Sequence, residues 1–414
     1  MNPVKKLPFT KQQIQGLARK YPTPFYIYEE AGIRKTAQEL VESFSWNSGF
    51  KQYFAVKATP NPSILEILKK EGSGTDCSSL PELELSERVG ITGENIMFTS
   101  NDTPATEFKK ARELGAIINL DDIRHIEFLE KNAGLPDILS FRYNPGPLRE
   151  GNAIIGNPKE AKFGMTKAQL LESYAIAKSK GVKRFGLHTM VASNELRQDY
   201  FVETARMLFA LAHEIRESAG VELEFINLGG GLGIPYKPDE SAIDMKSMSA
   251  RIRGLYDDAV AKKLMPAVKL YTEYGRYITG PHGYLVSTVR HIKETYKKYA
   301  GLDACMANLM RPAMYGAYHH ITVLDKENEP KTTMYDVVGS LCENNDKFAI
   351  DRKLSAIVAG DIVVLHDAGA HGHAMGFNYN GKLRSAEFLQ TPDGKFRMIR
   401  RAETSEDYFA TLKF

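Results

Sequence analysis

The sequence predicts an α/β protein, in which a closed (β/α)8 barrel of the TIM type is combined with a second, mostly β C-terminal domain. Short β-prone runs alternate with helical patterns between about residues 50 and 275, and helical patterns become scarce after about residue 281. About eight strand–helix units in roughly 230 residues is the count of such a barrel, although a doubly wound open sheet gives the same alternation. Ionisable residues and glycines gather at the predicted carboxyl ends of the strands, where barrels carry their chemistry, and this favours the barrel.

The predicted barrel strands are β-prone runs separated by helices with start signals. The runs cover residues 52–56, 74–77, 96–100, 116–120, 137–143, 184–188, 224–228 and 267–273. Ser79 and Thr166 each begin a capping-box pattern, with Glu82 and Gln169 three residues later. Residues 196–219 carry apolar side chains at helical spacing, so we expect one face of that helix in the core; these are Phe201, Ala205, Leu208, Ala212 and Ile215.

The second domain is predicted from strand patterns at residues 283–293, 332–339, 356–365 and 395–400. We expect the early strand 24–28 to join it. The predicted domains are therefore residues 33–281 for the barrel, and residues 1–32 with 282–414 for the β-rich domain. Residues 144–158, rich in glycine and proline, are predicted to be a lid, and the charged residues 293–298 to be a solvated face.

Composition excludes several classes of protein. The 414-residue chain has 25% charged residues and a net charge of +3, too small to indicate a nucleic-acid or membrane surface. We find no apolar run of signal-peptide or bilayer length. Three widely spaced cysteines make no disulfide framework, and a reducing, cytoplasmic setting is expected. His319-His320 and His371-x-His373 lack a third ligand at zinc spacing, so no metal site is predicted.

Lys57 is the first candidate for chemistry. It ends the apolar run of residues 53–57, and we expect it at the mouth of a buried strand, partly stripped of water. Desolvation disfavours the ammonium form and makes the amine a nucleophile able to form a Schiff base. A lysine that merely extends from a strand end to solvent gives the same local pattern.

A glycine cluster and an acidic strand end add two further groups. Gly229–Gly231 follow the seventh predicted strand, and a backbone without Cβ atoms can turn its N–H groups on an anion, although a tight turn is the structural alternative. The cluster matches neither the dinucleotide fingerprint nor the P-loop. Glu273 ends the eighth run, where a carboxylate can hold a heterocyclic nitrogen protonated, and Arg276 can bind a substrate carboxylate bidentately. A structural ion pair is the alternative there.

Together these groups fit one cofactor. Pyridoxal phosphate needs an amine for its aldehyde, an amide cradle for its phosphate and an acid for its ring nitrogen. Lys57, Gly229–Gly231 and Glu273 can supply all three.

Eight short segments, in this order and spacing, resemble the fold-type III (alanine racemase-like) pyridoxal-phosphate decarboxylases, and most closely the diaminopimelate decarboxylases, over nearly the whole length. They are residues 53–61, 74–79 with 82–83, 162–164, 227–233, 273–276, 311–315, 342–346 and 366–380.

The resemblance implies roles for single residues around pyridoxal 5'-phosphate. Lys57 would hold the cofactor covalently, Glu273 would pair with its ring nitrogen, and Asp76 and Arg142 would lie near the imine and the ring. The phosphate would be bound by Ser193, Gly230, Gly231, Gly275, Arg276 and Tyr379. The substrate would be held by Arg276, Arg311 and Tyr315 at its distal carboxylate, by Glu343 at its distal ammonium, and by Tyr379. Cys342 would protonate the carbanion, and Cys342 and Glu343 would come from the partner subunit of a homodimer.

The resemblance also implies the reaction, the decarboxylation of meso-2,6-diaminopimelate to L-lysine and carbon dioxide. An ornithine or arginine decarboxylase has no distal carboxylate, and buried unpaired arginines would disfavour such a substrate.

Departures from the family pattern leave alternatives open. Met190 stands where the family has a ring-stacking histidine, and His188, two residues earlier on the same strand face, is the candidate to take over. Tyr274 replaces a proline, and His371 stands where tyrosine is frequent. The alternatives are a decarboxylase of a D-amino acid or carboxynorspermidine, a cofactor-binding but inactive regulatory homologue, and a racemase with Cys342 as its second base.

Overall fold

The computed structural model describes residues 5–149 and 156–414, which divide into two compact units. The first unit comprises Met1–Ile33, Pro235–Ser241 and Ile278–Phe414, and the second comprises Arg34–Ile234 and Ala242–Tyr277. The short segment Pro235–Ser241 thus belongs to the first unit although it lies between two barrel elements in the sequence.

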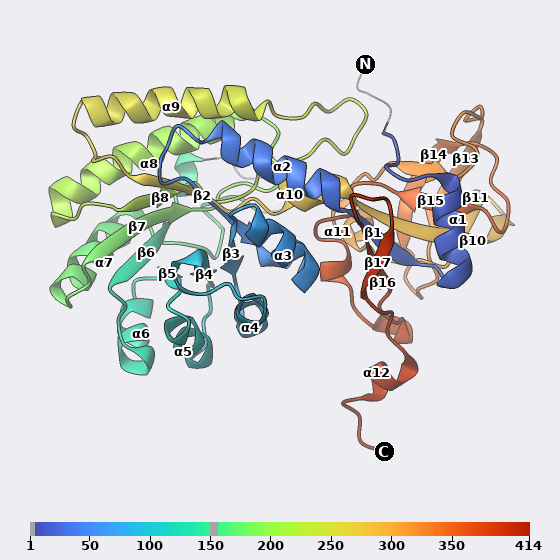
Figure 1. Ribbon diagram of the computed structural model, residues 1–414, viewed down its shortest axis with the longest axis horizontal. Helices are drawn as coiled ribbons and strands as arrows, with labels where there is room; N and C mark the ends of the chain where they lie inside the picture. Colours follow the sequence, from blue (N-terminus) through green and yellow to red (C-terminus); the bar gives the residue numbers. More distant parts are fainter. Residues whose placement is uncertain (1–4, 150–155) are drawn as a thin grey trace. The chain divides into compact units, whose positions relative to one another are not determined.

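The second unit is a closed barrel of parallel strands, which excludes the open-sheet alternative (Figure 1). Each strand pairs with its sequence neighbour, and the last strand pairs with the first. The strands are β2 (Lys51–Ala55), β3 (Gly74–Cys77), β4 (Ile96–Thr99), β5 (Ile117–Leu120), β6 (Ile138–Tyr143), β7 (Arg184–Thr189), β8 (Phe225–Asn227) and β9 (Lys269–Thr272). All eight lie within a residue or two of the predicted runs.

Helices connect the barrel strands and surround them (Figure 1). They are α2 (Glu30–Ser43), α3 (Pro62–Lys70), α4 (Leu80–Arg88), α5 (Ala105–Glu113), α6 (His125–Ala133), α7 (Lys167–Ser179), α8 (Gln198–Ala219) and α9 (Met245–Ala261), and the short α10 (Arg276–Thr279) follows β9. The capping box at the start of α7 is confirmed, since Thr166 and Gln169 exchange both bonds. The apolar face predicted for α8 is buried as expected.

The capping box predicted at the start of α4 is wrong. The Ser79 side chain makes no cap hydrogen bond there. The Leu80 amide instead donates to Glu107 Oε1 at 3.0 Å, and Glu82 Oε2 accepts from the Ser78 amide at 2.7 Å. A side chain from the next helix, α5, therefore satisfies an amide that a local cap would otherwise serve.

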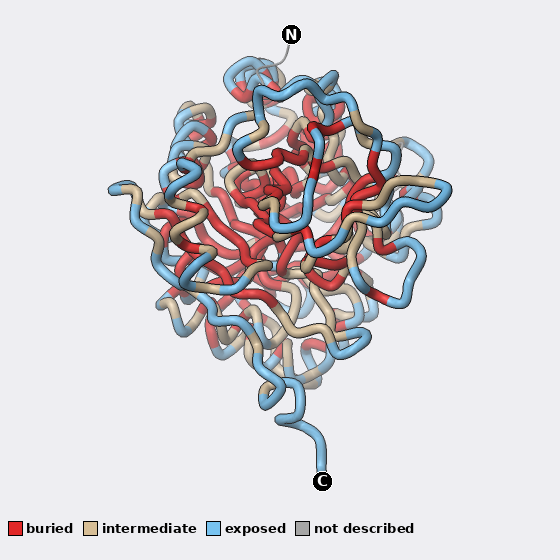
Figure 2. Tube along the Cα trace, turned by 90° about the vertical axis from the view of Figure 1, so that its right-hand side faces the viewer, coloured by how far each residue is buried: buried red, intermediate tan, exposed pale blue. Residues whose placement is uncertain are grey.

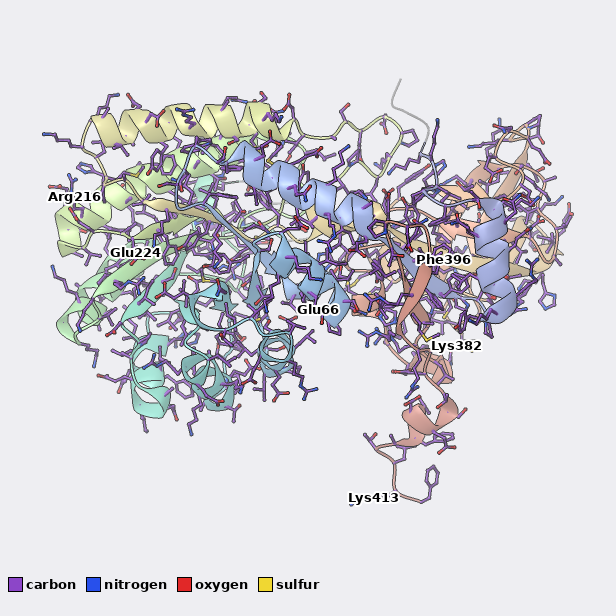
Figure 3. The ribbon with its side chains drawn as sticks, in the orientation of Figure 1. Glu66, Arg216, Glu224, Lys382, Phe396 and Lys413 are labelled. Atoms are coloured by element: carbon purple, nitrogen blue, oxygen red, sulfur yellow. The ribbon has the colours of Figure 1, made fainter. Side chains whose placement is uncertain are left out.

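The barrel interior has an apolar floor and a charged amino end. The floor is a buried cluster of inward-facing side chains from alternate positions: Tyr53, Met97, Ile117, Ile138, Phe225 and Tyr271. At the amino end, Glu224 (labelled in Figure 3) accepts hydrogen bonds from Arg184 Nη2 at 2.7 Å and Lys269 Nζ at 2.9 Å. The hydrogen bond with Arg184 lowers the pKa of Glu224 to about 2. This end stabilises the barrel, and the opposite end is left for chemistry.

The first unit is built on a nine-stranded mixed sheet in the described part of the chain. Its main path runs β14-β13-β11-β10-β1-β16-β17, with β12 and β15 paired beside β10. The strands are β1 (Phe25–Glu29), β10 (Gly283–Glu294), β11 (Lys298–Leu302), β12 (Ile321–Val323), β13 (Thr333–Val338), β14 (Lys347–Leu354), β15 (Ile362–Leu365), β16 (Ala386–Gln390) and β17 (Phe396–Arg400). Its helices are α1 (Lys11–Lys20), α11 (Arg311–Tyr315) and α12 (Ser405–Phe409).

The prediction found β1, which joins this sheet as expected, and four of the later strands, but it missed β11, β12, β14 and β16. These strands are short or carry charged residues on their exposed faces, so their period-two pattern is weak. The run predicted at 356–365 is a strand only from Ile362, because Val358–Asp361 form a turn with Gly360 at φ +93°. The barrel strands are mostly buried. Figure 2 shows the C-terminal end of the chain exposed.

Neither unit carries a helix, within the described residues, that is long and apolar enough to cross a membrane. The predicted lid at 144–158 lies partly outside the described residues, at 150–155. Asn144, at the start of this segment, contacts its end: Asn144 Nδ2 donates to the carbonyl of Pro158 at 3.0 Å and to that of Phe163 at 2.7 Å.

Candidate active site

Three of the expected site residues share one layer of the barrel interior. In an eight-stranded barrel with a shear of about eight, the pairing register shifts by about one residue from each strand to the next. A residue therefore lies level with a residue two strands away that stands two positions after the one reached by strand pairing. His188 pairs with Asn227, Asn227 pairs with Tyr271, and Glu273 lies two residues further on. From Glu273, the pairing leads through Tyr53 of β2 to Gly74 of β3, and Asp76 lies two residues further on. All three are buried just above the apolar floor.

Glu273 is held as a carboxylate. Its Oε1 accepts from Asn227 Nδ2 at 2.7 Å, and its Oε2 lies 3.0 Å from His188 Nε2, which therefore carries the donated proton. Burial raises the pKa of Glu273, but His188, Lys57 and the Asn227 hydrogen bond outweigh burial, so its pKa lies below the ordinary value. A buried, ionised acid at a barrel mouth suits a cationic N–H partner.

Asp76 has the opposite behaviour. Burial and repulsion by Glu273 raise its pKa well above the ordinary value, with Lys57 opposing. Its Oδ1 accepts no hydrogen bond among the described residues. One layer thus holds one carboxyl group with a lowered pKa and one with a raised pKa, a separation of pKa values that is frequent at functional sites.

Arg142 is buried beside this layer. Its guanidinium lies 3.3 Å from Asp121 Oδ1, donates to the Met190 carbonyl at 3.4 Å and stacks 4.6 Å from the centre of the Phe163 ring. Burial lowers the pKa of Arg142, and Asp121 and Glu273 counteract this. The group is thereby fixed in place by three contacts.

The expected setting of Lys57 was wrong in one respect. The strand β2 ends at Ala55, and Lys57 lies on a short 3-10 turn, Val56–Ala58, with its side chain exposed rather than stripped of water. The turn is packed closely, because a Cβ on Gly275 would lie 2.7 Å from that of Ala58. The backbone of Lys57 is thus fixed while its amine is left accessible.

The glycine turn after β8 approaches its neighbours too closely for side chains. Gly229 and Gly231 have φ of +74° and +90°, and a Cβ on Gly230 would lie 2.7 Å from the Glu273 carbonyl oxygen. The Gly230 amide points at the sulfur of Met190, at 3.2 Å. A thioether is a weak acceptor, so this amide can serve a stronger one such as a phosphate oxygen.

Met190 and His188 lie in different surroundings. His188 Nε2 is 3.0 Å from Glu273 Oε2 in the barrel interior. Met190 lies just past the end of β7 and borders a mostly apolar pocket with Tyr143, Pro145 and Phe163. The half-buried Ser193 follows in the same loop, and Arg276 is buried at the start of α10.

The remaining predicted residues belong to the first unit. Arg311 is 2% exposed, its Nη1 donates to His319 Nε2 at 3.0 Å, and it stacks 4.4 Å from the Tyr236 ring. His319 can accept there because its Nδ1 donates to the His366 carbonyl at 2.8 Å. The guanidinium is thus held by a neutral acceptor and a ring.

Tyr315, Cys342, Glu343 and Tyr379 are exposed. The hydrogen bond with Glu343 raises the pKa of Tyr379, so these two side chains are neighbours. The Cys342 amide donates to Asn380 Oδ1 at 2.8 Å, and its thiol is free.

Several supporting residues were missed by sequence reasoning. They are Asn227, which binds Glu273; Asp121, which pairs with Arg142; and His319 and Tyr236, which hold Arg311. Asn227 could have been found, because it is an inward-facing polar residue on the seventh strand. The Tyr236 contact gives no signal in the sequence, because it joins segments far apart in the chain. No three His, Cys, Asp or Glu side chains of the described residues are placed to bind a metal ion.

An accessible amine, an amide-lined glycine turn and an ionised buried acid at one end of a parallel barrel define an enzyme that works through pyridoxal phosphate. The family profile described as "Pyridoxal-dependent decarboxylase, pyridoxal binding domain" matches residues 30–280, and the chain belongs to this family.

Its similarity to known proteins extends over nearly the whole chain. Protein TabA from Pseudomonas amygdali pv. tabaci is 45% identical over 97% of this chain and 94% of that protein. The diaminopimelate decarboxylase of Methanothermobacter thermautotrophicus is 36% identical over 94% of this chain and 92% of its own. The structure of the M. jannaschii diaminopimelate decarboxylase in co-complex with L-lysine superimposes with a TM-score of 0.89 at 31% identity, covering 96% of this chain and 94% of that one.

The cofactor of this family, pyridoxal 5'-phosphate, fits the residues present. The buried polar atoms Asp76 Oδ1 and His188 Nδ1 have no hydrogen-bond partner among the described residues, and the turn at Gly229–Gly231 is shaped so that no Cβ fits. Such atoms and such a cradle are expected where a polar ligand binds.

Replacing Gly230 by alanine is expected to weaken cofactor binding by about tenfold or more, because the new Cβ would displace the Glu273 carbonyl and turn the amide away. Titration of the apoprotein with pyridoxal phosphate, followed by absorbance, measures the dissociation constant. Gly254 is the control, since it lies exposed in α9 with no atom within 4 Å of an added Cβ. Gly254→Ala should bind the cofactor normally and stabilise the protein by up to about 1 kcal/mol. Normal cofactor binding by Gly230→Ala would contradict the assignment of the cradle.

Proposed function

We propose that this protein decarboxylates meso-2,6-diaminopimelate to L-lysine and carbon dioxide. The observation that carries the proposal is the full-length similarity to diaminopimelate decarboxylases, together with two buried arginines, Arg276 and Arg311, at positions of the family's carboxylate-binding motifs. A substrate with an amino-acid group at each end offers a distal carboxylate that such arginines can bind, whereas ornithine and arginine have no distal carboxylate.

The proposed roles within the barrel follow from charge and position. When bound, pyridoxal phosphate supplies a ring that accepts the electron pair left when the bond from Cα to the carboxylate breaks. Lys57 holds the cofactor through its amine, and the glycine turn with Ser193, Gly275 and Arg276 holds the phosphate. Glu273, kept ionised by His188, accepts a hydrogen bond from the protonated ring nitrogen, and Asp76, whose pKa is raised, lies in the same layer of the barrel.

The first unit supplies the proposed substrate contacts. Arg311, fixed by His319 and Tyr236, binds the distal carboxylate with Tyr315 and Arg276. Tyr379 contacts phosphate and substrate. Cys342 donates the proton that replaces the carboxylate at Cα, and Glu343 accepts the distal ammonium. A free, exposed thiol suits a proton donor that acts on a ligand rather than within its own fold.

We also propose that the protein acts in the cytoplasm as a homodimer in which Cys342 and Glu343 serve the site of the partner. The support is that both side chains are exposed in the isolated chain. Mixing Lys57→Ala subunits with Cys342→Ala subunits tests the shared site. Recovery of about a quarter of the wild-type activity is expected if each site draws residues from both subunits, and no recovery would contradict it.

The substrate is tested with a panel of amino acids. Purified protein with pyridoxal phosphate should release carbon dioxide from meso-diaminopimelate and form L-lysine, with at least about 100-fold lower kcat/KM for L-ornithine and L-arginine. Turnover of another amino acid with none of diaminopimelate would overturn the proposal.

A related amino acid is the second candidate substrate. Two observations favour it: Met190 at the position of the family's ring-stacking histidine, and the 45% identity to a relative that does not carry the name of a diaminopimelate decarboxylase. The same panel, extended to D-amino acids and carboxynorspermidine, separates the two candidates. Binding of the cofactor with no product from any of them would indicate an inactive homologue.

A further inference from the structure

The layer that holds Asp76, His188 and Glu273 has a fourth member, Asn119, to which no role has been given. Asp76 pairs with Met97 of β4, and Met97 pairs with Ile117 of β5. Asn119 lies two residues after Ile117, so it is level with Asp76. Three strands lie between β5 and β9 in either direction around the eight-stranded barrel, so Asn119 faces Glu273 across the interior.

The side chain of Asn119 points into the barrel. It stands two residues after Ile117, which belongs to the buried floor, and side chains two apart on a strand share a face. Asn119 is 2% exposed, so its amide has no access to bulk water.

Neither polar atom of the Asn119 amide has a hydrogen-bond partner among the described residues. Beside it in register on β6, the buried Ser140 hydroxyl is also without one in the described part of the chain. Buried amides and hydroxyls in folded proteins are almost always hydrogen-bonded, because leaving them unpaired costs free energy. Such a cluster indicates that a polar ligand belongs between these strands.

The chemistry of the cluster restricts the ligand. A carboxamide offers two N–H donors and a carbonyl acceptor, and a serine hydroxyl offers both functions. An oxygen that both donates and accepts hydrogen bonds satisfies all of them, whereas a simple anion or cation satisfies only half. The layer also contains Asp76 Oδ1 and His188 Nδ1, which add an acceptor or donor each.

We propose that Asn119 and Ser140 form a hydrogen-bonding subsite inside the barrel, which binds a hydroxyl-type oxygen next to Asp76, either the ring hydroxyl of the cofactor or an ordered water molecule. The inference depends on the cofactor of the family and not on the substrate proposed above. Asn119 is then a cofactor-site residue that contributes to affinity without taking part in proton transfer.

The test is Asn119→Leu, which keeps the shape and removes both polar functions. The dissociation constants of pyridoxal phosphate and of its 3-deoxy analogue are measured by absorbance titration of the apoprotein, and the Tm of the apoprotein is recorded. A weakening of about tenfold or more for pyridoxal phosphate is expected, with no fall in apoprotein Tm, since no hydrogen bond within the chain is lost. Weakening for pyridoxal phosphate alone identifies the ring hydroxyl as the ligand, and equal weakening for both identifies water.

Asn47 is the matched control, because it is a buried asparagine of the same unit whose amide is fully used. Its Nδ2 donates to the Val268 carbonyl at 3.0 Å, and its Oδ1 accepts from the Leu270 amide at 3.1 Å. Asn47→Leu should lower the apoprotein Tm and leave cofactor affinity unchanged. Asn119→Ala provides the same comparison without added bulk if the leucine variant does not fold.

Two results would overturn the proposal. One is a change of less than about twofold in both dissociation constants for Asn119→Leu and Asn119→Ala. The other is a fall in apoprotein Tm as large as that of Asn47→Leu, which would make Asn119 a structural residue.

Discussion

Lys57→Ala is expected to lose the yellow chromophore of the bound cofactor and to reduce kcat/KM by at least about 1,000-fold. The amine is exposed at the carboxyl end of β2, on a turn whose backbone is fixed by close packing against Gly275. The visible spectrum and carbon dioxide release measure the two effects.

Lys51 provides the control for this variant. It is the first residue of β2, so it lies at the end of the barrel opposite to Lys57, which follows the last residue of β2. Its ammonium lies 5.2 Å from the centre of the Tyr53 ring, a contact worth about 0.5–1 kcal/mol at exposed sites. Lys51→Ala should keep the chromophore and the activity. After borohydride reduction of the wild type, mass spectrometry should find the pyridoxyl group on the peptide that contains Lys57. Finding it on another lysine would refute the assignment.

The sequence predicted the barrel well because the barrel depends on local signals. Each strand is a short apolar run and each helix has a periodic apolar face, and residues at strand ends meet wherever parallel strands meet. Asp76, His188 and Glu273 all lie at or next to the ends of predicted strands, so the strand pattern places them at one end of the barrel. The β-rich unit was predicted less well, because strands such as β14, with the sequence Lys-Phe-Ala-Ile-Asp-Arg-Lys-Leu, are defined by partners distant in the chain.

The supporting contacts of the site could not be predicted for the same reason. Asp121 lies one strand away from Arg142, and Tyr236 reaches Arg311 from a segment that belongs to the first unit. Local pattern assigns a residue to a strand end, but only register decides which side chains share a layer. Asn119 illustrates this, because nothing but the pairing of β3, β4 and β5 brings it level with Asp76.

Glu273→Gln is expected to lower kcat by about 100-fold or more while the protein remains folded. The amide oxygen can still accept from Asn227, and the amide nitrogen can donate to His188 Nε2 once the imidazole proton moves to Nδ1, so the local hydrogen bonds survive with the negative charge removed. The electron-accepting power of the cofactor depends on a protonated ring nitrogen, which a neutral amide cannot stabilise as a carboxylate does. Steady-state kinetics should show the loss mainly in kcat, with a smaller change in KM.

The pH dependence separates this role from a structural one. Because the pKa of Glu273 lies below its ordinary value, the carboxylate stays ionised as the pH falls, and its contribution is lost only below that range. The wild-type kcat should therefore show no loss from Glu273 between pH 5 and 8, and Glu273→Gln should be lower by a constant factor across this window. Glu224→Gln, at the amino end of the barrel, removes a carboxylate bound by Arg184 and Lys269, so it should lower Tm and leave kcat within about twofold. An equal loss of kcat in both variants would mean that barrel stability, and not the charge at position 273, controls the reaction.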